Sequence, residues 1–186
     1  MRKAPNQVRI IGGLWRSRTI EFPDGVGLRP TPDRVRETVF NWLGQCLDEK
    51  ICLDLFAGSG ALGFEALSRG AAEVLMIEQS RQVARSLKDN AQRLGAGNAF
   101  VENVDALYFL RGAARPFDVV FLDPPFSQGL LEQALRMIPP WLAPDAKIYT
   151  ESELGFEPSP TWKILKQSRA GQVKFQILTP AIAQES

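Results

Sequence analysis

One glycine-rich stretch constrains the fold of this chain more than any other. Residues 50–63 read KICLDLFAGSGALG, which predicts an apolar strand at 51–56, a glycine turn, and a helix that begins near Ala61. Glycines let the backbone approach a ligand closely, and a helix N-terminus presents free N–H groups at the same place. The stretch therefore predicts a ligand cradle. Its G-x-G-x-x-G spacing at 58–63 leaves a dinucleotide open among the ligands.

Strands and helices alternate after this turn. We expect further strands at 73–78, 99–102, 117–123 and 147–151, and helices at 61–69, 80–94, 106–110 and 128–138. Such alternation predicts a mostly parallel α/β sheet covered on both faces. The strands expected at 162–167 and 172–179 have no helix between them, so they should close a seven-stranded sheet as an antiparallel hairpin.

The first 48 residues precede this pattern. Residues 7–11 and 18–22 predict a small β-ribbon with Trp15, Arg16 and Arg18 near its tip, and an amphipathic helix follows from about residue 31. Thr31 or Asp33 would cap that helix, with Pro32 in its first turn. We therefore expect an N-terminal extension, 1–48, and a ligand-binding domain, 49–186.

Composition removes several classes of site. The chain of 186 residues contains no histidine, so histidine-dependent triads and histidine zinc sites are impossible. Two cysteines are not a disulfide framework, and no apolar run approaches the roughly 20 residues that span a bilayer. We expect a cytoplasmic protein with no metal and no membrane partner. No feature indicates an oligomer interface, so we expect a monomer.

Charge is distributed unevenly along the chain. Residues 1–36 contain eight basic and three acidic side chains, although the whole chain has a net charge of only +1. A basic front of this kind favours a polyanionic partner, and its alternative is a solvated basic surface.

Acidic residues near the predicted strand ends help to choose the ligand. Asp54 lies just before the glycine turn, where a carboxylate would repel a pyrophosphate but suits an ammonium group. Glu78 ends the second strand, where an acid could bind ribose hydroxyls of either cofactor class. After the third strand, Asp105 and Ala106 offer a carboxylate and a backbone N–H to an adenine edge. The fourth strand ends in Asp123-Pro124-Pro125-Phe126.

This ordered set resembles a class I methyltransferase that uses S-adenosylmethionine. Segments 10–18, 29–43 and 62–71 narrow the resemblance to the bacterial family that methylates the exocyclic N2 of a guanine in 16S ribosomal RNA. The resemblance implies a Rossmann-like fold over nearly the whole chain. It also implies a set of cofactor-binding residues: Asp54, Ala57, Gly58, Ser59, Gly60, Glu78, Asp105 and Ala106.

The same resemblance assigns the chemistry to residues 123–126. The Asp123 carboxylate and the Pro124 carbonyl would accept N–H groups of the target amine, the prolines would stiffen the loop, and Phe126 would stack on the base. Ribosomal RNA, naked or in a partly assembled small subunit, is the implied partner. The expected RNA contacts are Arg9, Arg16, Arg18, Arg29, Arg34 and Arg36.

Three alternatives remain open from the sequence. The Asp-Pro-Pro-Phe motif also suits other amino groups, such as adenine N6. The glycine turn alone permits a nicotinamide-dependent oxidoreductase. A non-catalytic RNA-binding factor could retain the same fold.

Overall fold

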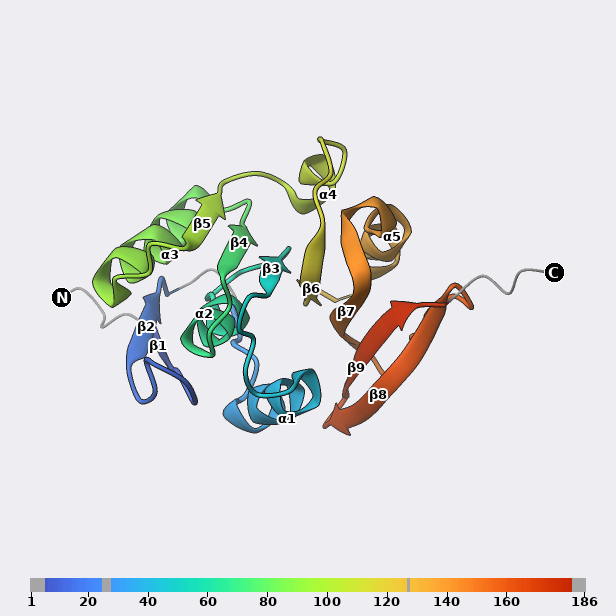
Figure 1. The fold of residues 1–186 in the computed structure, drawn as a ribbon, viewed down its shortest axis with the longest axis horizontal. Coiled ribbons are helices and arrows are strands. Elements are labelled where there is room, and N and C mark those ends of the chain that lie inside the picture. Colours follow the sequence, from blue (N-terminus) through green and yellow to red (C-terminus); the bar gives the residue numbers. More distant parts are fainter. Residues whose placement is uncertain (1–5, 25–27, 127, 182–186) are drawn as a thin grey trace.

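The main sheet has seven strands, with helices on both faces (Figure 1). A computed structural model describes residues 6–24, 28–126 and 128–181. Within these, the strand order is β5-β4-β3-β6-β7-β9-β8. Their bounds are β3 Ile51–Asp54, β4 Glu73–Ile77, β5 Ala99–Glu102, β6 Phe117–Leu122, β7 Leu142–Glu153, β8 Trp162–Ala170 and β9 Val173–Pro180.

The direction of the strands confirms the predicted class. β5, β4, β3, β6 and β7 are parallel, and β9 is antiparallel to both β7 and β8. The C-terminal hairpin therefore closes the sheet as expected, and its second strand lies beside β7. The chain winds from β3 to β4 and β5 on one side and to β6 and β7 on the other. In α/β sheets such a switch point opens a crevice at the carboxyl ends of the strands.

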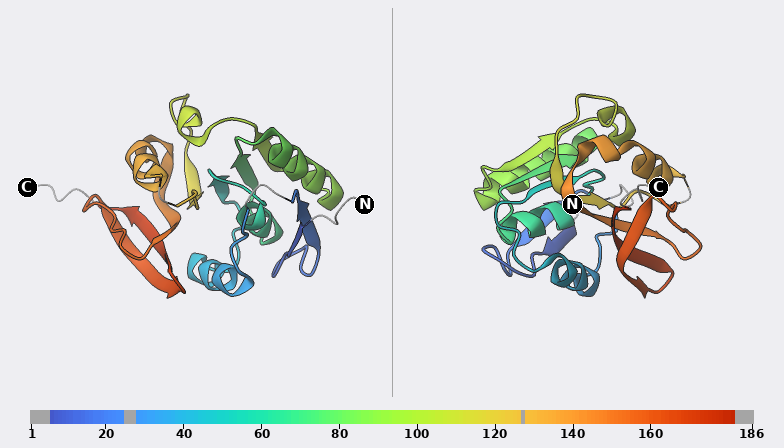
Figure 2. Two further views of the ribbon diagram at one scale, coloured as in Figure 1. Left: turned by 180° about the vertical axis from the view of Figure 1, so that it is seen from behind. Right: turned by 45° about the vertical axis from the view of Figure 1, so that its right-hand side comes forward.

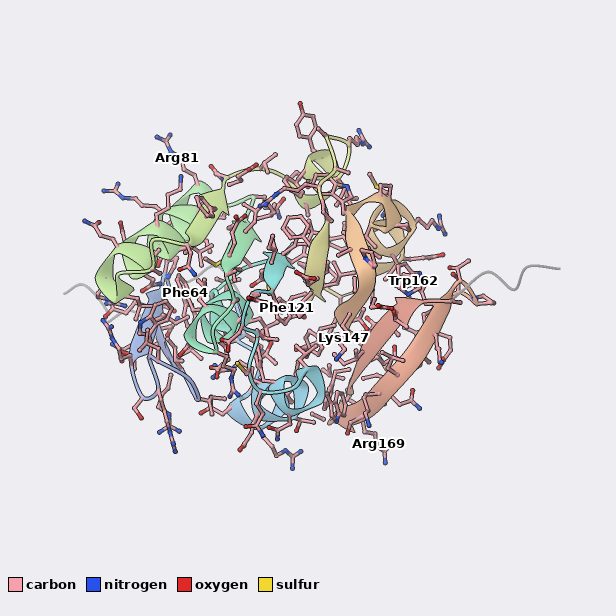
Figure 3. All side chains as sticks on the ribbon, viewed as in Figure 1. Phe64, Arg81, Phe121, Lys147, Trp162 and Arg169 are labelled. Atoms are coloured by element: carbon pink, nitrogen blue, oxygen red, sulfur yellow. The ribbon has the colours of Figure 1, made fainter. Side chains whose placement is uncertain are left out.

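Two hydrophobic clusters cover the two faces of the sheet. One cluster joins α1 (Asp33–Leu43), α2 (Ala61–Ser68) and α3 (Arg81–Leu94) to the sheet. The other contains α4 (Ala106–Phe109), α5 (Leu130–Met137) and the 3₁₀ helix η1 (Pro139–Trp141). Neighbouring residues of β3 alternate between the clusters, Cys52 facing the first and Leu53 the second. In Figure 3, Phe64 and Phe121 lie inside the fold, whereas Arg81 points away from it.

The predicted N-terminal ribbon is present as β1 (Asn6–Arg9) paired antiparallel with β2 (Thr19–Phe22). It packs on α3. There the Asn90 side chain accepts a hydrogen bond from the backbone N–H of Glu21 at 3.0 Å and donates one to the Glu21 carbonyl at 2.7 Å. The ribbon and the C-terminal hairpin lie at opposite ends of the molecule (Figures 1 and 2). Val8 and Ile20 belong to the same core cluster as α2, so the core continues across the 48/49 boundary and that division stays a prediction.

The start of α1 differs from the expectation. Pro32 is the N-cap residue, and no side chain caps the helix there. The Thr31 hydroxyl instead donates to Glu151, 120 residues away, and Asp33 accepts from Arg36, three residues further along the same helix. In the described part of the chain, no helix has the length and apolar character that a membrane span requires.

Candidate active site

A cavity of about 660 Å³ opens at the carboxyl ends of the parallel strands. That volume lies within the roughly 300–1,000 Å³ typical of small-molecule sites. The structure brings most of the predicted site residues to this one cavity. Its wall includes Asp54, Ala57, Gly58, Ser59, Glu78, Asp105, Ala106, Asp123, Pro124, Pro125, Phe126 and, among the arginines, Arg29.

Gly60 does not line the cavity, but its backbone conformation and packing determine the shape of the turn. It has φ +81°, and its N–H donates to the Ala57 carbonyl at 2.7 Å. A Cβ at this position would lie 2.6 Å from Leu87 and 2.7 Å from the Phe64 ring. Both the left-handed backbone and the close packing therefore require glycine, and together they set the direction in which α2 leaves the turn.

Asp54 places a buried carboxyl group on the cavity wall. The residue is only 1% exposed, and its Oδ2 accepts the backbone N–H of Gly63 at 3.1 Å. Burial raises the pKa of Asp54 to about 7, the Gly63 hydrogen bond opposes this rise, and the charge of Glu78 adds to it. A cationic ligand group would stabilise the ionised carboxylate here, so the position fits the predicted sulfonium and ammonium better than a pyrophosphate.

Glu78 is held in place by the backbone around it. Its Oε2 accepts the N–H of Gly58 at 3.0 Å and its Oε1 accepts the N–H of Ser80 at 2.7 Å. Asn103 donates to the carbonyls of Glu78 and Gln79, which ties the ends of β4 and β5 together. The carboxylate is thus fixed at the cavity wall before any ligand binds.

Asp105 both caps a helix and lines the cavity. Its Oδ1 accepts the N–H of Tyr108 at 2.8 Å, and it thereby caps α4. The buried Ala106 follows it on the same wall.

The loop after β6 forms the opposite wall. Pro124 is buried, whereas Phe126 remains 38% exposed at the cavity mouth. The pKa of Asp123 is raised well above its usual value, first by burial and then by the charges of Glu151 and Asp54, while a Thr31 hydrogen bond lowers it.

The structure adds three residues that the sequence reasoning missed. The Thr31 hydroxyl lies 2.9 Å from Glu151 Oε1 and 3.4 Å from Asp123 Oδ2, so one hydroxyl separates the two carboxyl groups. The Tyr149 hydroxyl donates to the same Glu151 oxygen at 2.5 Å. Burial raises the pKa of Glu151, and the hydrogen bonds from Tyr149 and Thr31 oppose the rise. The sequence contained a signal for Glu151, because a glutamate within a buried strand such as β7 rarely lacks a polar partner.

The expectation that Arg36 contacts RNA is wrong, because its side chain is 0% exposed. Its guanidinium pairs with Glu65 at 3.3 Å and Asp33 at 2.6 Å, and donates to the carbonyls of Thr31 and Arg9 at 3.1 and 2.9 Å. Arg36 therefore holds the loop that carries Thr31 into the site.

The other predicted RNA contacts stay predictions. Arg16, Arg18, Arg29 and Arg34 are exposed. Arg9 is also exposed and pairs with Asp33 at 3.3 Å. Trp15 is buried, so it packs under the ribbon. Over the described ranges, no three His, Cys, Asp or Glu side chains are grouped so as to hold a metal ion.

Comparison with known proteins places this chain in a family. A sequence model of the family described as Conserved hypothetical protein 95 matches residues 8–179. The chain belongs to this family. Ribosomal RNA small subunit methyltransferase D of Escherichia coli (strain K12) is 49% identical over 185 residues, covering 94% of this chain and 93% of that protein.

Solved structures agree with this placement. The structure named "Putative methyltransferase yhhF from Escherichia coli" has a TM-score of 0.87 and 47% identity, and the match covers 94% of this chain and 98% of that one. The T. thermophilus 16S rRNA N2 methyltransferase RsmC, solved with AdoMet and guanosine, has a TM-score of 0.74 at 20% identity, covering 96% of this chain and 50% of that one. The likeness to RsmC, at 20% identity, shows the shared fold alone. Family membership favours a methyltransferase over the nicotinamide-dependent alternative.

Proposed function

We propose that this protein transfers a methyl group from S-adenosylmethionine to the exocyclic N2 of a guanine in 16S ribosomal RNA. One observation carries the proposal. The glycine turn and acids of the cofactor half share a single cavity with Asp123, Pro124 and Phe126 of the base-binding half. The names of its relatives support both the reaction and the ribosomal substrate.

The residues of the cofactor half suit S-adenosylmethionine. Asp54 and the turn at 57–60 would hold the methionine portion, because a nearby cation favours the ionised form of a buried carboxyl group. Glu78 would accept the ribose hydroxyls through lone pairs left after its two backbone bonds. Asp105 and Ala106 would contact the adenine. When bound, the cofactor supplies an activated methyl group.

The loop after β6 would prepare the target amine. The lone pair of an exocyclic guanine amine is delocalised into the ring, so the amine is a weak nucleophile. Acceptors at the Asp123 carboxylate and the Pro124 carbonyl would hold its N–H groups and orient the nitrogen. The prolines offer no N–H to compete. Phe126 at the cavity mouth would stack on the base, and such stacking contributes about 1–3 kcal/mol.

A paired base cannot reach this cavity. The target must be unpaired or flipped, which costs a few kcal/mol. Exposed arginines on the ribbon and near the cavity mouth would bind the RNA backbone and help offset that cost. We further propose that the enzyme acts as a monomer in the cytoplasm on ribosomal RNA, either naked or in a partly assembled small subunit.

Methyl transfer from labelled S-adenosylmethionine to unmodified small subunits and to naked 16S RNA tests the proposal. Asp123→Ala should fold and bind the cofactor, but its rate should fall by about 10²-fold or more, the scale for losing one preorganised site group. Asp89→Ala, an exposed change on α3, is the matched control and should keep full activity. Full activity in Asp123→Ala, or labelling at a site other than guanine N2, would overturn the proposal.

A further inference from the structure

We propose that Glu151 reads the N1–H of the target base and thereby selects a guanine over other bases that present an amino group. This inference rests on the proposed function and deepens it. Asp123 alone accepts an amine N–H, which guanine, adenine and 2-aminopurine all provide. A second acceptor beside Asp123 would distinguish them.

The geometry leaves one oxygen of Glu151 available for this task. Its Oε1 already accepts from Tyr149 at 2.5 Å and from Thr31 at 2.9 Å. The Glu151 side chain lines the cavity, and no hydrogen bond found among the described residues uses its Oε2. Because the two donors occupy Oε1, the second oxygen is the one that we expect to meet the ligand.

Thr31 sets the spacing between the two acceptors. Its hydroxyl lies between Glu151 Oε1 and Asp123 Oδ2, at 2.9 and 3.4 Å. Arg36 fixes the Thr31 backbone by donating to its carbonyl at 3.1 Å. Two carboxyl groups are thus held on one wall, one hydroxyl apart.

This pair of acceptors matches the edge of guanine. The N2 amine of guanine is flanked by N1–H, so the two atoms present adjacent donors. The N6 amine of adenine and the 2-amino group of 2-aminopurine are instead flanked by an N1 lone pair. A carboxylate opposite that lone pair would repel it and be left without a donor, and a buried site of this kind rejects an analogue that lacks the donor.

Glu151→Gln should reverse this preference. Tyr149 and Thr31 both donate to the side-chain oxygen, so the carbonyl oxygen of the glutamine would turn to them and its NH₂ group would face the cavity. That NH₂ group opposes the N1–H of guanine but can donate to the N1 lone pair of 2-aminopurine. Because the substitution removes a buried charge and retains the side-chain shape, the fold should be maintained.

The experiment compares subunits reconstituted with RNA that carries either guanine or 2-aminopurine at the mapped target position. For the natural protein, kcat/KM should be about 10- to 100-fold higher on guanine, the scale of a hydrogen bond to a charged group. In Glu151→Gln this ratio should fall to about one or invert. Glu153→Gln, at the exposed end of the same strand, is the matched control and should keep the natural ratio.

The outcomes separate the two proposals. Equal activity of the natural protein on both RNAs would overturn the role of Glu151 and leave the methyltransferase proposal standing. So would a Glu151→Gln variant that loses activity equally on both, because a purely structural role lowers both rates alike. If the natural protein methylates neither RNA, both proposals fail.

Discussion

Ionised Asp54 should lower the free energy of unfolding but strengthen cofactor binding, and Asp54→Asn tests both effects. Raising the pKa of its carboxyl group from 3.8 to about 7 by burial corresponds to about 4 kcal/mol, at about 1.4 kcal/mol for each pKa unit. Between those two values the folded state binds a proton that the unfolded state has released. The free energy of unfolding therefore falls as pH rises from about 4 to 7.

The variant should lose this pH dependence. Asparagine has a similar shape and can accept the Gly63 N–H, but it never ionises. Relative to the natural protein, Asp54→Asn should gain about 3 kcal/mol of stability between pH 5 and pH 8, because most of the linkage of Asp54 falls within that interval. Urea unfolding at the two pH values without cofactor measures the change. Asp89→Asn, on the exposed face of α3, is the control.

Cofactor affinity should move in the opposite direction. A cationic cofactor favours ionised Asp54, so its Kd for the natural protein should rise by up to about tenfold for each pH unit below 7. Asp54→Asn should bind S-adenosylmethionine weakly, and its Kd should not show this dependence on pH. Calorimetric titration with S-adenosylmethionine measures both. The reasoning is refuted if the stability difference between the two proteins is the same at pH 5 and pH 8.

Three further predictions concern the scaffold and the RNA surface. Gly60→Ala should lower the free energy of unfolding, measured in urea, by about 3 kcal/mol or more, because its Cβ would overlap Leu87 and Phe64. The control Gly95→Ala should lower it by only about 1–2 kcal/mol, because Gly95 has φ +71° but nothing lies within 4 Å of the added Cβ. Glu65→Gln should lower the free energy of unfolding by about 3–5 kcal/mol, because it removes the carboxylate of the buried Arg69 and one of the two carboxylates that pair with the buried Arg36. Glu132→Gln, which breaks an exposed pair with Arg136, should lower it by about 0.5 kcal/mol or less. Arg16→Ala with Arg18→Ala should reduce the slope of log affinity for RNA against log salt by about 1.4–1.8 while sparing cofactor affinity, and an unchanged slope would remove the ribbon from the RNA site.

Local sequence signals predicted that most of the residues proposed to bind the cofactor lie at one cavity. Strand β3, the glycine turn and α2 are contiguous, so their order alone places Asp54 and Gly58 beside one another. Glu78 and Asp105 follow because neighbouring parallel strands end at the same edge of a sheet. The alternation of strands and helices therefore placed these residues at one edge of the sheet, and the family resemblance assigned them to the cofactor.

Long-range partners explain what the sequence could not show. The basic N-terminal segment suggested Arg36 as an RNA contact, but Glu65, 29 residues away on α2, pairs with its guanidinium, which also donates to the Arg9 carbonyl of the ribbon. The role of Glu151 likewise depends on Thr31, which is 120 residues distant. A buried ion pair and a bridging hydroxyl join segments that local periodicity treats separately.

The electrostatic arrangement of the molecule explains how such an acidic site can serve an RNA enzyme. Asp54, Glu78, Asp123 and Glu151 all line one cavity. Among the exposed arginines, Arg29 belongs to the cavity wall, whereas others lie outside it on the ribbon and on α1. A phosphate entering the cavity would meet these carboxyl groups at low dielectric, so we expect the RNA backbone to stay outside the cavity, near the exposed arginines. A neutral base meets no such barrier, and a cationic cofactor is attracted. We therefore expect the same carboxyl groups that supply hydrogen-bond acceptors in a chain without histidine also to determine which part of the RNA can enter.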